Sequence, residues 1–145
     1  IDQYEVTVLY RQLSTLLEMR HSAYDFGSQD NAGQKFRAAH QELLDVDMLI
    51  LDEVCVNETV LKKNSQSWLG NLLRQRLVNK KNCILITNHN LGDLEQALGR
   101  YCFESIKEYD TYKVRFSGPS RRKGLTLDEE DQVTSAPRYQ PNQVR

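Results

Sequence analysis

The sequence lacks long apolar runs, an excess of charge of either sign and paired cysteines. No apolar run reaches the roughly 20 residues that a membrane-spanning helix needs, and we see no signal peptide, so we expect no membrane partner. The 19 Lys and Arg residues balance 20 Asp and Glu residues, which neither favours nor excludes nucleic acid as a partner. The three cysteines are widely spaced and odd in number, which argues against a disulfide framework and favours a reducing, cytoplasmic location.

Proline is absent until residue 119, and all three prolines lie in the final segment. The same segment carries the charge blocks RRK at 121–123 and DEED at 128–131. Prolines and blocks of like charge are typical of extended or disordered chain. We therefore predict one folded domain at residues 1–118 and an extended or disordered tail at residues 119–145.

Short apolar segments alternate with amphipathic ones before the tail. The patterns predict strands at residues 5–10, 48–51, 83–87 and 111–118. They predict helices at residues 11–22, 35–44, 68–77, 91–99 and 100–109. Strands that alternate with helices indicate an α/β fold with right-handed crossovers and an open, mostly parallel sheet. Ligands of such sheets bind beyond the carboxyl ends of the strands.

The segment DMLILDEVCVNET, residues 47–59, joins a buried strand to two acids. Its continuous apolar run is typical of a strand that is covered on both faces, and paired charges are too costly for a core. We therefore expect Asp52 and Glu53 at the strand end, with the two side chains pointing in opposite directions. One carboxylate there suits Mg²⁺, and the other can polarise an attacking water, as in the Walker B pattern of ATPases. The alternative is a strand that ends in two solvated acids.

The segment ILITNHN, residues 84–90, ends a second strand in polar groups. Asn88, with Thr87 beside it, is the best candidate to sense a γ-phosphate and to help place the attacking water. The alternative is that Asn88 and Asn90 begin a loop or cap the next helix. We expect His89 to be a solvated loop histidine.

A phosphate-binding loop of the form GxxxxGK[ST] is missing from these residues. The nearest approach is GSQDNAGQK, residues 27–35. Its glycines are one residue too far apart, Gln34 replaces the lysine, and no strand precedes it. We therefore reject it as a phosphate-binding loop.

Four segments, taken in order, resemble the ATPase core of DnaC-type replicative helicase loaders and the related IstB transposition ATPases. They are VTVLYRQLSTLLEMRH, LLDVDMLILDEVCV, LLRQRLVNKKNCILITNHNLGDLEQALG and VRFSGPSRRKG. The resemblance implies a three-layer P-loop NTPase of the AAA+ class, with helices on both faces of a parallel sheet ordered 5-1-4-3-2. It also implies that the first strand and the Walker A loop lie upstream of Ile1.

The resemblance assigns roles to individual residues. Asp52 is similar to the acid that supports Mg²⁺, Glu53 to the catalytic base and Asn88 to the sensor 1 residue, with Thr87 also near the nucleotide. Arg76 matches a recurrent, structural arginine. Ser105 occupies the position of the arginine finger, and Arg100 and Lys107 are displaced along the helix.

The implied function is coupling of ATP binding and hydrolysis to the placing of a replicative DNA helicase on single-stranded DNA. The implied cofactors are ATP and Mg²⁺, with self-association as a further expectation. The basic candidates for contact with DNA are Lys62, Lys63, Lys80, Lys81, Arg121 and Arg122. The alternative is a degenerate, non-hydrolysing module that binds a helicase, a transposase or DNA. A carboxylate-metal nuclease is weaker, because only two acids stand at an identifiable strand end.

Overall fold

A computed structural model describes residues 4–24, 31–57 and 60–119 of the chain. The chain divides into two units, residues 1–112 and residues 113–145. All described helices and strands belong to the first unit. Apart from Pro119, the predicted tail lies outside the described residues.

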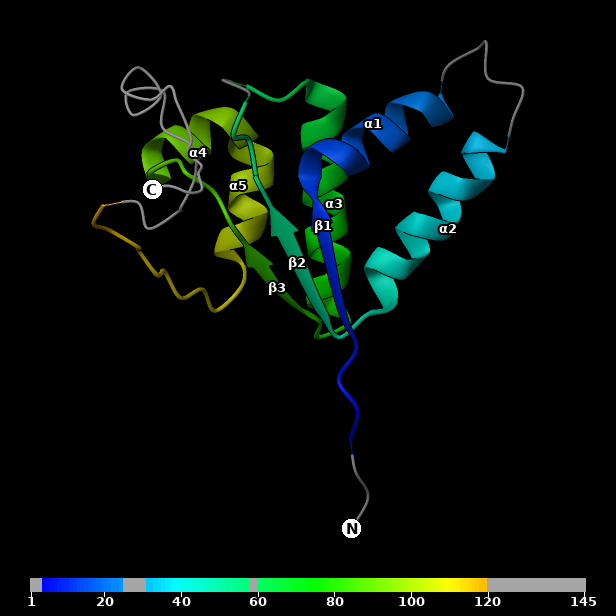
Figure 1. Ribbon diagram of the computed structural model, residues 1–145, viewed down its shortest axis with the longest axis horizontal. Coiled ribbons are helices and arrows are strands. Elements are labelled where there is room, and N and C mark those ends of the chain that lie inside the picture. Colours follow the sequence, from blue (N-terminus) through cyan, green and yellow to red (C-terminus); the bar gives the residue numbers. More distant parts are fainter. Residues whose placement is uncertain (1–3, 25–30, 58–59, 120–145) are drawn as a thin grey trace, which may run out of the picture. The chain divides into compact units, whose positions relative to one another are not determined.

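Three parallel strands form one sheet in the order β1-β2-β3 (Figure 1). They are β1 (Val8–Gln12), β2 (Met48–Asp52) and β3 (Asn82–Leu85). Gln12 is the register partner of Asp52 in β2, and Leu51 is the partner of Leu85 in β3. The predicted α/β fold with a parallel sheet is therefore confirmed. β1 lies slightly later in the sequence than predicted.

Five helices accompany the sheet in the described part of the chain. They are α1 (Leu13–Ala23), α2 (Ala32–Asp45), α3 (Lys63–Val78), α4 (Leu91–Leu98) and α5 (Arg100–Lys107). Asn90 caps α4 by accepting a hydrogen bond from the Asp93 N–H at 2.9 Å, which confirms the capping alternative for that residue. Among the described residues, no helix combines the length and apolar composition that crossing a bilayer requires.

One face of the sheet carries the core. Leu9, Leu49 and Leu51 are buried on it, and α3 lies behind the strands in Figure 1. The core continues through the apolar side chains of α3, α4 and α5, namely Leu69, Leu72, Leu73, Leu94, Ala97, Leu98 and Cys102. Alternate strand residues thus pack against helices, as the two-residue period of a strand requires.

The other face of the sheet is apolar but open. Val8, Tyr10, Ile84 and Ile86 are between 44% and 57% exposed, and Ile50 is only partly buried. The expectation of helices on both faces, and of a β2 buried on both sides, is therefore wrong for the described residues. The physical reason is that each of the five described helices contributes buried residues to the core cluster on the opposite face, the one that includes Leu9, Leu49 and Leu51.

The predicted strand at residues 111–118 is also wrong, because residues 111–119 contain no strand. A strand needs a neighbour to pair its backbone N–H and C=O groups. In the described part of the chain β3 pairs with β2 alone. The alternating sequence of this segment is therefore insufficient to form a strand.

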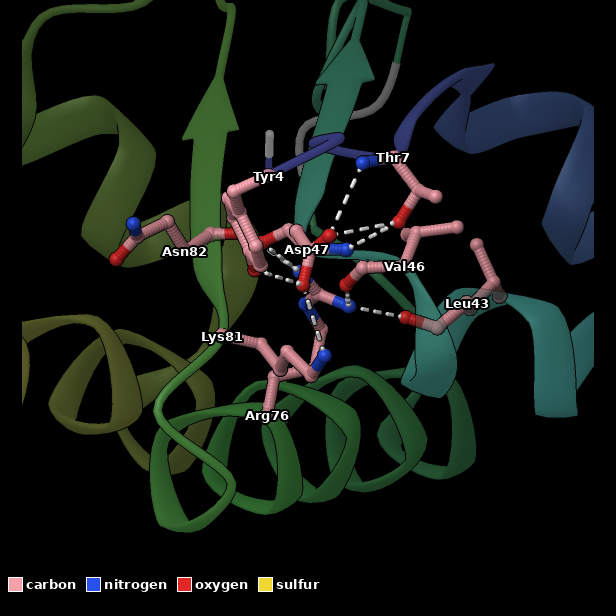
Figure 2. Close-up of polar contacts among 8 residues, drawn as sticks. All are labelled: Tyr4, Thr7, Leu43, Val46, Asp47, Arg76, Lys81 and Asn82. Atoms are coloured by element: carbon pink, nitrogen blue, oxygen red, sulfur yellow. Dashed lines mark hydrogen bonds and ion pairs between the residues drawn. The ribbon is translucent and has the colours of Figure 1, made fainter. Parts of the chain in front are cut away.

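Buried Arg76 donates hydrogen bonds to backbone carbonyls at the amino-terminal edge of the sheet (Figure 2). Its Nη1 donates to the carbonyls of Leu43 at 2.5 Å and Val46 at 2.9 Å. Its Nη2 donates to the carbonyls of Asn82 at 2.6 Å and Asp47 at 3.3 Å. Arg76 thereby joins α3 to the end of α2 and to the starts of β2 and β3, so the structural role implied for it is confirmed.

Asp47 completes this edge through its side chain. Its carboxylate accepts hydrogen bonds from the Thr7 N–H and from Lys81 Nζ, each at 3.0 Å, and Figure 2 shows both. The Thr7 N–H, followed by the Lys81 ammonium and the Thr7 hydroxyl, holds the pKa of Asp47 well below its usual range. This edge is therefore built of paired polar groups and lies at the opposite end of the strands from Asp52.

Candidate functional site

The carboxyl edge of the sheet brings the predicted site residues together. Beyond the sheet register, the Ile86 N–H donates to the Leu51 carbonyl and the Val54 N–H donates to the Ile86 carbonyl, each at 2.9 Å. These bonds tie the chain after β2 to the chain after β3. Asp52 and Glu53 therefore stand beside Thr87 and Asn88, as expected for the ends of neighbouring parallel strands.

Asp52 is held by hydrogen bonds to both carboxylate oxygens. Oδ1 accepts from the N–H of Glu53 at 2.7 Å, and Oδ2 accepts from the hydroxyl of Tyr10 in β1. The same bond raises the pKa of Tyr10, because the neutral hydroxyl is the form that donates to the carboxylate. The carboxylate of Asp52 is partly buried and oriented.

Glu53 turns out of the strand in a left-handed conformation. Its φ is +52°, and Cys55, two residues later, has a φ of +60°. Such conformations are costly for residues other than glycine, and they cluster at functional sites. The exposed Glu53 carboxylate accepts a hydrogen bond from Gln12 Nε2 at 2.6 Å. The expected opposite orientation of the two acids is therefore wrong, because this turn ends the strand alternation and β1 holds both acids.

Thr87 and His89 fix the loop behind the acids. Thr87 Oγ1 donates to the Val54 carbonyl at 2.8 Å and accepts from the His89 N–H at 3.2 Å. The His89 ring nitrogen Nε2 lies 2.6 Å from the Cys55 carbonyl, which accepts its hydrogen. His89 is half-buried, so the expectation of a solvated loop histidine is wrong. The hydroxyl of Thr87 is engaged with backbone.

Asn88 differs from Asp52, Glu53 and Thr87 in having no side-chain hydrogen bond within the part of the chain that the structure describes. Its side chain is also exposed. An exposed amide without a hydrogen bond to the described residues can bind a ligand oxygen without first breaking a protein contact. Of the pair Thr87 and Asn88, Asn88 is thus the one available for a ligand.

The carboxylates at this edge can supply only part of the coordination of Mg²⁺, so other ligands would have to complete it. No group of three His, Cys, Asp or Glu side chains that could hold a metal occurs among residues 4–24, 31–57 and 60–119. Mg²⁺ often takes one or two carboxylates and completes its six oxygens with water and substrate phosphates. Asp52, with Glu53 next to it, suits an ion that arrives with a polyphosphate.

The basic candidates lie at two distant places. Lys62 and Lys63 begin α3, whereas Lys80 and Lys81 follow its end. The 16 residues of α3 separate the two pairs by about 24 Å. Lys81 is already paired with Asp47 at 3.0 Å. Arg121 and Arg122 lie outside the described residues.

A cavity of about 890 Å³ opens between α1 and the start of α3. Three of the side chains that line it are basic: Arg20, His21 and Lys62. Nε of Arg20 is buried without a hydrogen-bond partner in the part of the chain that the structure describes. The guanidinium lies 5.3 Å from the ring centre of Tyr24 and 6.0 Å from that of Trp68. Neither Arg20 nor His21 is predicted as a site residue from the sequence, because basic residues on an amphipathic helix are ordinarily solvated.

Ser105 cannot act on a neighbouring molecule. It is fully buried, and its hydroxyl donates to the Tyr101 carbonyl at 3.1 Å. The nearby cation Lys107 is exposed and pairs with Glu104 at 3.0 Å. The position of Ser105, which the resemblance alone would assign to an arginine finger, is therefore a packing position between α5 and Gly70 of α3.

Comparison with known proteins assigns no family. No protein-family model matches the chain, and no curated protein matches it at a significant level.

Proposed function

We propose that this chain is the ATPase core of a helicase loader, in which Asp52 supports the Mg²⁺ of ATP and Glu53 activates the attacking water. The observation that carries the proposal is the position of both acids at the carboxyl end of the middle strand. Asn88, whose side chain is exposed, follows the neighbouring strand β3 by three residues and is the amide that we assign to the γ-phosphate. In chemical terms the edge offers a metal ligand, a base and a phosphate sensor side by side.

The sheet order supports the same proposal. In an AAA+ sheet ordered 5-1-4-3-2, strands 2, 3 and 4 are neighbours and strand 3 carries the Walker B acids. The observed order β1-β2-β3, with Asp52 at the end of β2 and Glu53 directly after it, agrees with that part of the order. The second edge of β3 is unpaired among the described residues, which is where strand 1 would pair.

The acid that supports Mg²⁺ should matter for nucleotide binding. In the full-length product of the gene, Asp52→Asn is expected to weaken the affinity for ATP–Mg²⁺ by about tenfold or more, since outer-shell and ligand changes at metal sites have effects of this size. Fluorescence of a labelled ATP measures the affinity. The control is Asp45→Asn, an exposed acid at the end of α2. Unchanged affinity in Asp52→Asn would remove Asp52 from the nucleotide site.

Single-stranded DNA is the second ligand that we propose, and a replicative helicase is the protein partner implied by the resemblance. Support for DNA comes from the cavity beside Lys62, where Arg20 adds a second positive charge and Tyr24 adds aromatic surface, although the lining also includes the acid Glu18. Cytoplasmic location and self-association belong to the same proposal.

Binding to DNA should depend on Lys62 and on salt. Lys62→Ala is expected to weaken binding of a labelled oligonucleotide. It should also reduce the slope of the logarithm of the binding constant against the logarithm of the salt concentration by about one, the value for one lost phosphate contact. Fluorescence anisotropy at several salt concentrations measures both. Lys35→Ala, an exposed lysine on α2 that is not among the candidates for contact with DNA, is the matched control. Affinity that does not change between low and moderate salt would contradict the proposal for DNA.

The second candidate function is a non-hydrolysing interaction module. The observation that favours it is the open apolar face with Val8, Tyr10, Ile84 and Ile86, a kind of surface that marks contact with another protein or segment. ATP turnover by the full-length product, lost on substitution of Glu53, distinguishes the ATPase from this module.

A further inference from the structure

We infer that Tyr10 is a positioning residue that sets the orientation of the Asp52 carboxylate for a divalent cation. The inference rests on the proposed function, because it assigns Asp52 the role of metal ligand. The sequence pattern predicts Tyr10 only as an aromatic strand residue. The structure adds the contact between its hydroxyl and Asp52 Oδ2.

The sheet register explains why Tyr10 reaches Asp52. Gln12 pairs with Asp52 and Tyr10 pairs with Ile50, so Tyr10 and Asp52 lie two residues apart along neighbouring strands on the same face. Aromatic side chains reach such diagonal neighbours. Tyr10 is 50% exposed and lies on the open face of the sheet, so its ring is not required to fill the core. Its placement is therefore better explained by the hydroxyl than by burial.

Each carboxylate oxygen of Asp52 accepts one hydrogen bond. The Glu53 N–H binds Oδ1 at 2.7 Å, and the Tyr10 hydroxyl binds Oδ2. Together they leave one side-chain orientation, and each oxygen keeps a second lone pair for a cation or for a water bound to it. The hydroxyl that orients a ligand carboxylate in this way is an outer-shell partner, and loss of such partners lowers metal affinity by about 10–100-fold.

The fold supplies a matched control. Tyr4 also donates its hydroxyl to an aspartate, to Asp47 Oδ1 at 3.3 Å, but at the opposite end of the sheet. Tyr4→Phe and Tyr10→Phe therefore remove the same chemical group from equivalent kinds of contact. Both tyrosines are exposed, so neither change creates a core cavity.

The experiment uses Mn²⁺ in the presence of ATP as the probe, because this edge suits an ion that arrives with a polyphosphate, and it uses the isotope-labelled full-length product. Mn²⁺ broadens the amide resonances close to it, and three-bond couplings report the side-chain orientation of Asp52. In the wild type we expect broadening of the Asp52 and Glu53 amides and one Asp52 rotamer. Tyr10→Phe should require about tenfold more Mn²⁺ for the same broadening and should show averaged rotamers. Tyr4→Phe should match the wild type, and Asp52→Asn should abolish the broadening.

The possible failures are distinguishable. Equal Mn²⁺ dependence and a single Asp52 rotamer in Tyr10→Phe, with broadening lost in Asp52→Asn, would overturn the role of Tyr10 and leave the metal role of Asp52 intact. Tighter Mn²⁺ binding in Tyr10→Phe would overturn it too, because the hydroxyl would then compete with the ion. No broadening of Asp52 and Glu53 in the wild type would overturn the metal site and the role of Tyr10 together.

Discussion

Glu53→Gln is expected to lower the rate of ATP hydrolysis in the full-length product by about 10²–10⁴-fold, the usual contribution of a general base. Affinity for ATP–Mg²⁺ should stay close to that of the wild type, because Glu53 acts on water and not on the ion. Glutamine has the shape of glutamate and can still accept the hydrogen bond that Gln12 donates to residue 53. The substitution thus removes the base and leaves the geometry in place.

Phosphate release measures the rate in this experiment, and a labelled ATP measures the affinity. The control is Glu95→Gln, an exposed acid on α4. Full turnover in Glu53→Gln would contradict the role of Glu53 as a base and would favour the alternative that the strand simply ends in two solvated acids. Loss of binding together with turnover would show instead that Glu53 shapes the nucleotide site.

Arg76→Met is expected to destabilise the domain by about 3 kcal/mol or more. The guanidinium is fully buried and bonds four backbone carbonyls, those of Leu43, Val46, Asp47 and Asn82. Each buried carbonyl that loses its donor costs roughly 1–3 kcal/mol. Methionine fills part of the volume but offers no donor, so the loss is mainly one of hydrogen bonds.

Urea unfolding, followed by the fluorescence of Trp68 and by circular dichroism, measures this change. Arg37→Met, on the exposed face of α2, is the matched control and should change stability by less than about 0.5 kcal/mol. A loss of less than about 1 kcal/mol in Arg76→Met would mean that water replaces the guanidinium at these carbonyls. The hydrogen-bond network in Figure 2 would then be dispensable.

The order of helices and strands could be predicted because the apolar periods differ. The spacing of Trp68, Leu69, Leu72 and Leu73 indicates a helix, and Met48–Leu51 indicates a strand. Solvent exposure could not be predicted in the same way. Ile84 and Ile86 are as apolar as buried residues, so their strand segment is predicted to be covered on both faces of the sheet. In the structure both side chains are 44% exposed. Apolar character does not identify which segment covers a face.

The strand predicted at residues 111–118 shows a second limit. Its alternation describes side chains, but a strand is stabilised by backbone hydrogen bonds to a neighbour. That neighbour is absent from the sheet of the described residues. Sequence periodicity therefore predicts a potential strand and cannot supply its partner.

The site was predictable in part for a topological reason. Parallel strands end at one edge, so Asp52, Glu53 and Asn88 could be placed together before the structure was known. The contacts from Tyr10 and Gln12 could not, because they depend on the register of β1 and on the left-handed φ of +52° at Glu53. Neither quantity is visible in a local sequence pattern.

Titration of the full-length product with ATP, with and without Mg²⁺, tests most directly whether Asp52 supports the ion of a bound nucleotide. Calorimetry on the wild type and on Asp52→Asn gives four dissociation constants. We predict that Mg²⁺ strengthens ATP binding to the wild type and that most of this gain is lost in Asp52→Asn, while binding without Mg²⁺ is similar in both. An equal gain from Mg²⁺ in the two proteins would contradict the assignment of the carboxyl edge of β2 as the nucleotide site.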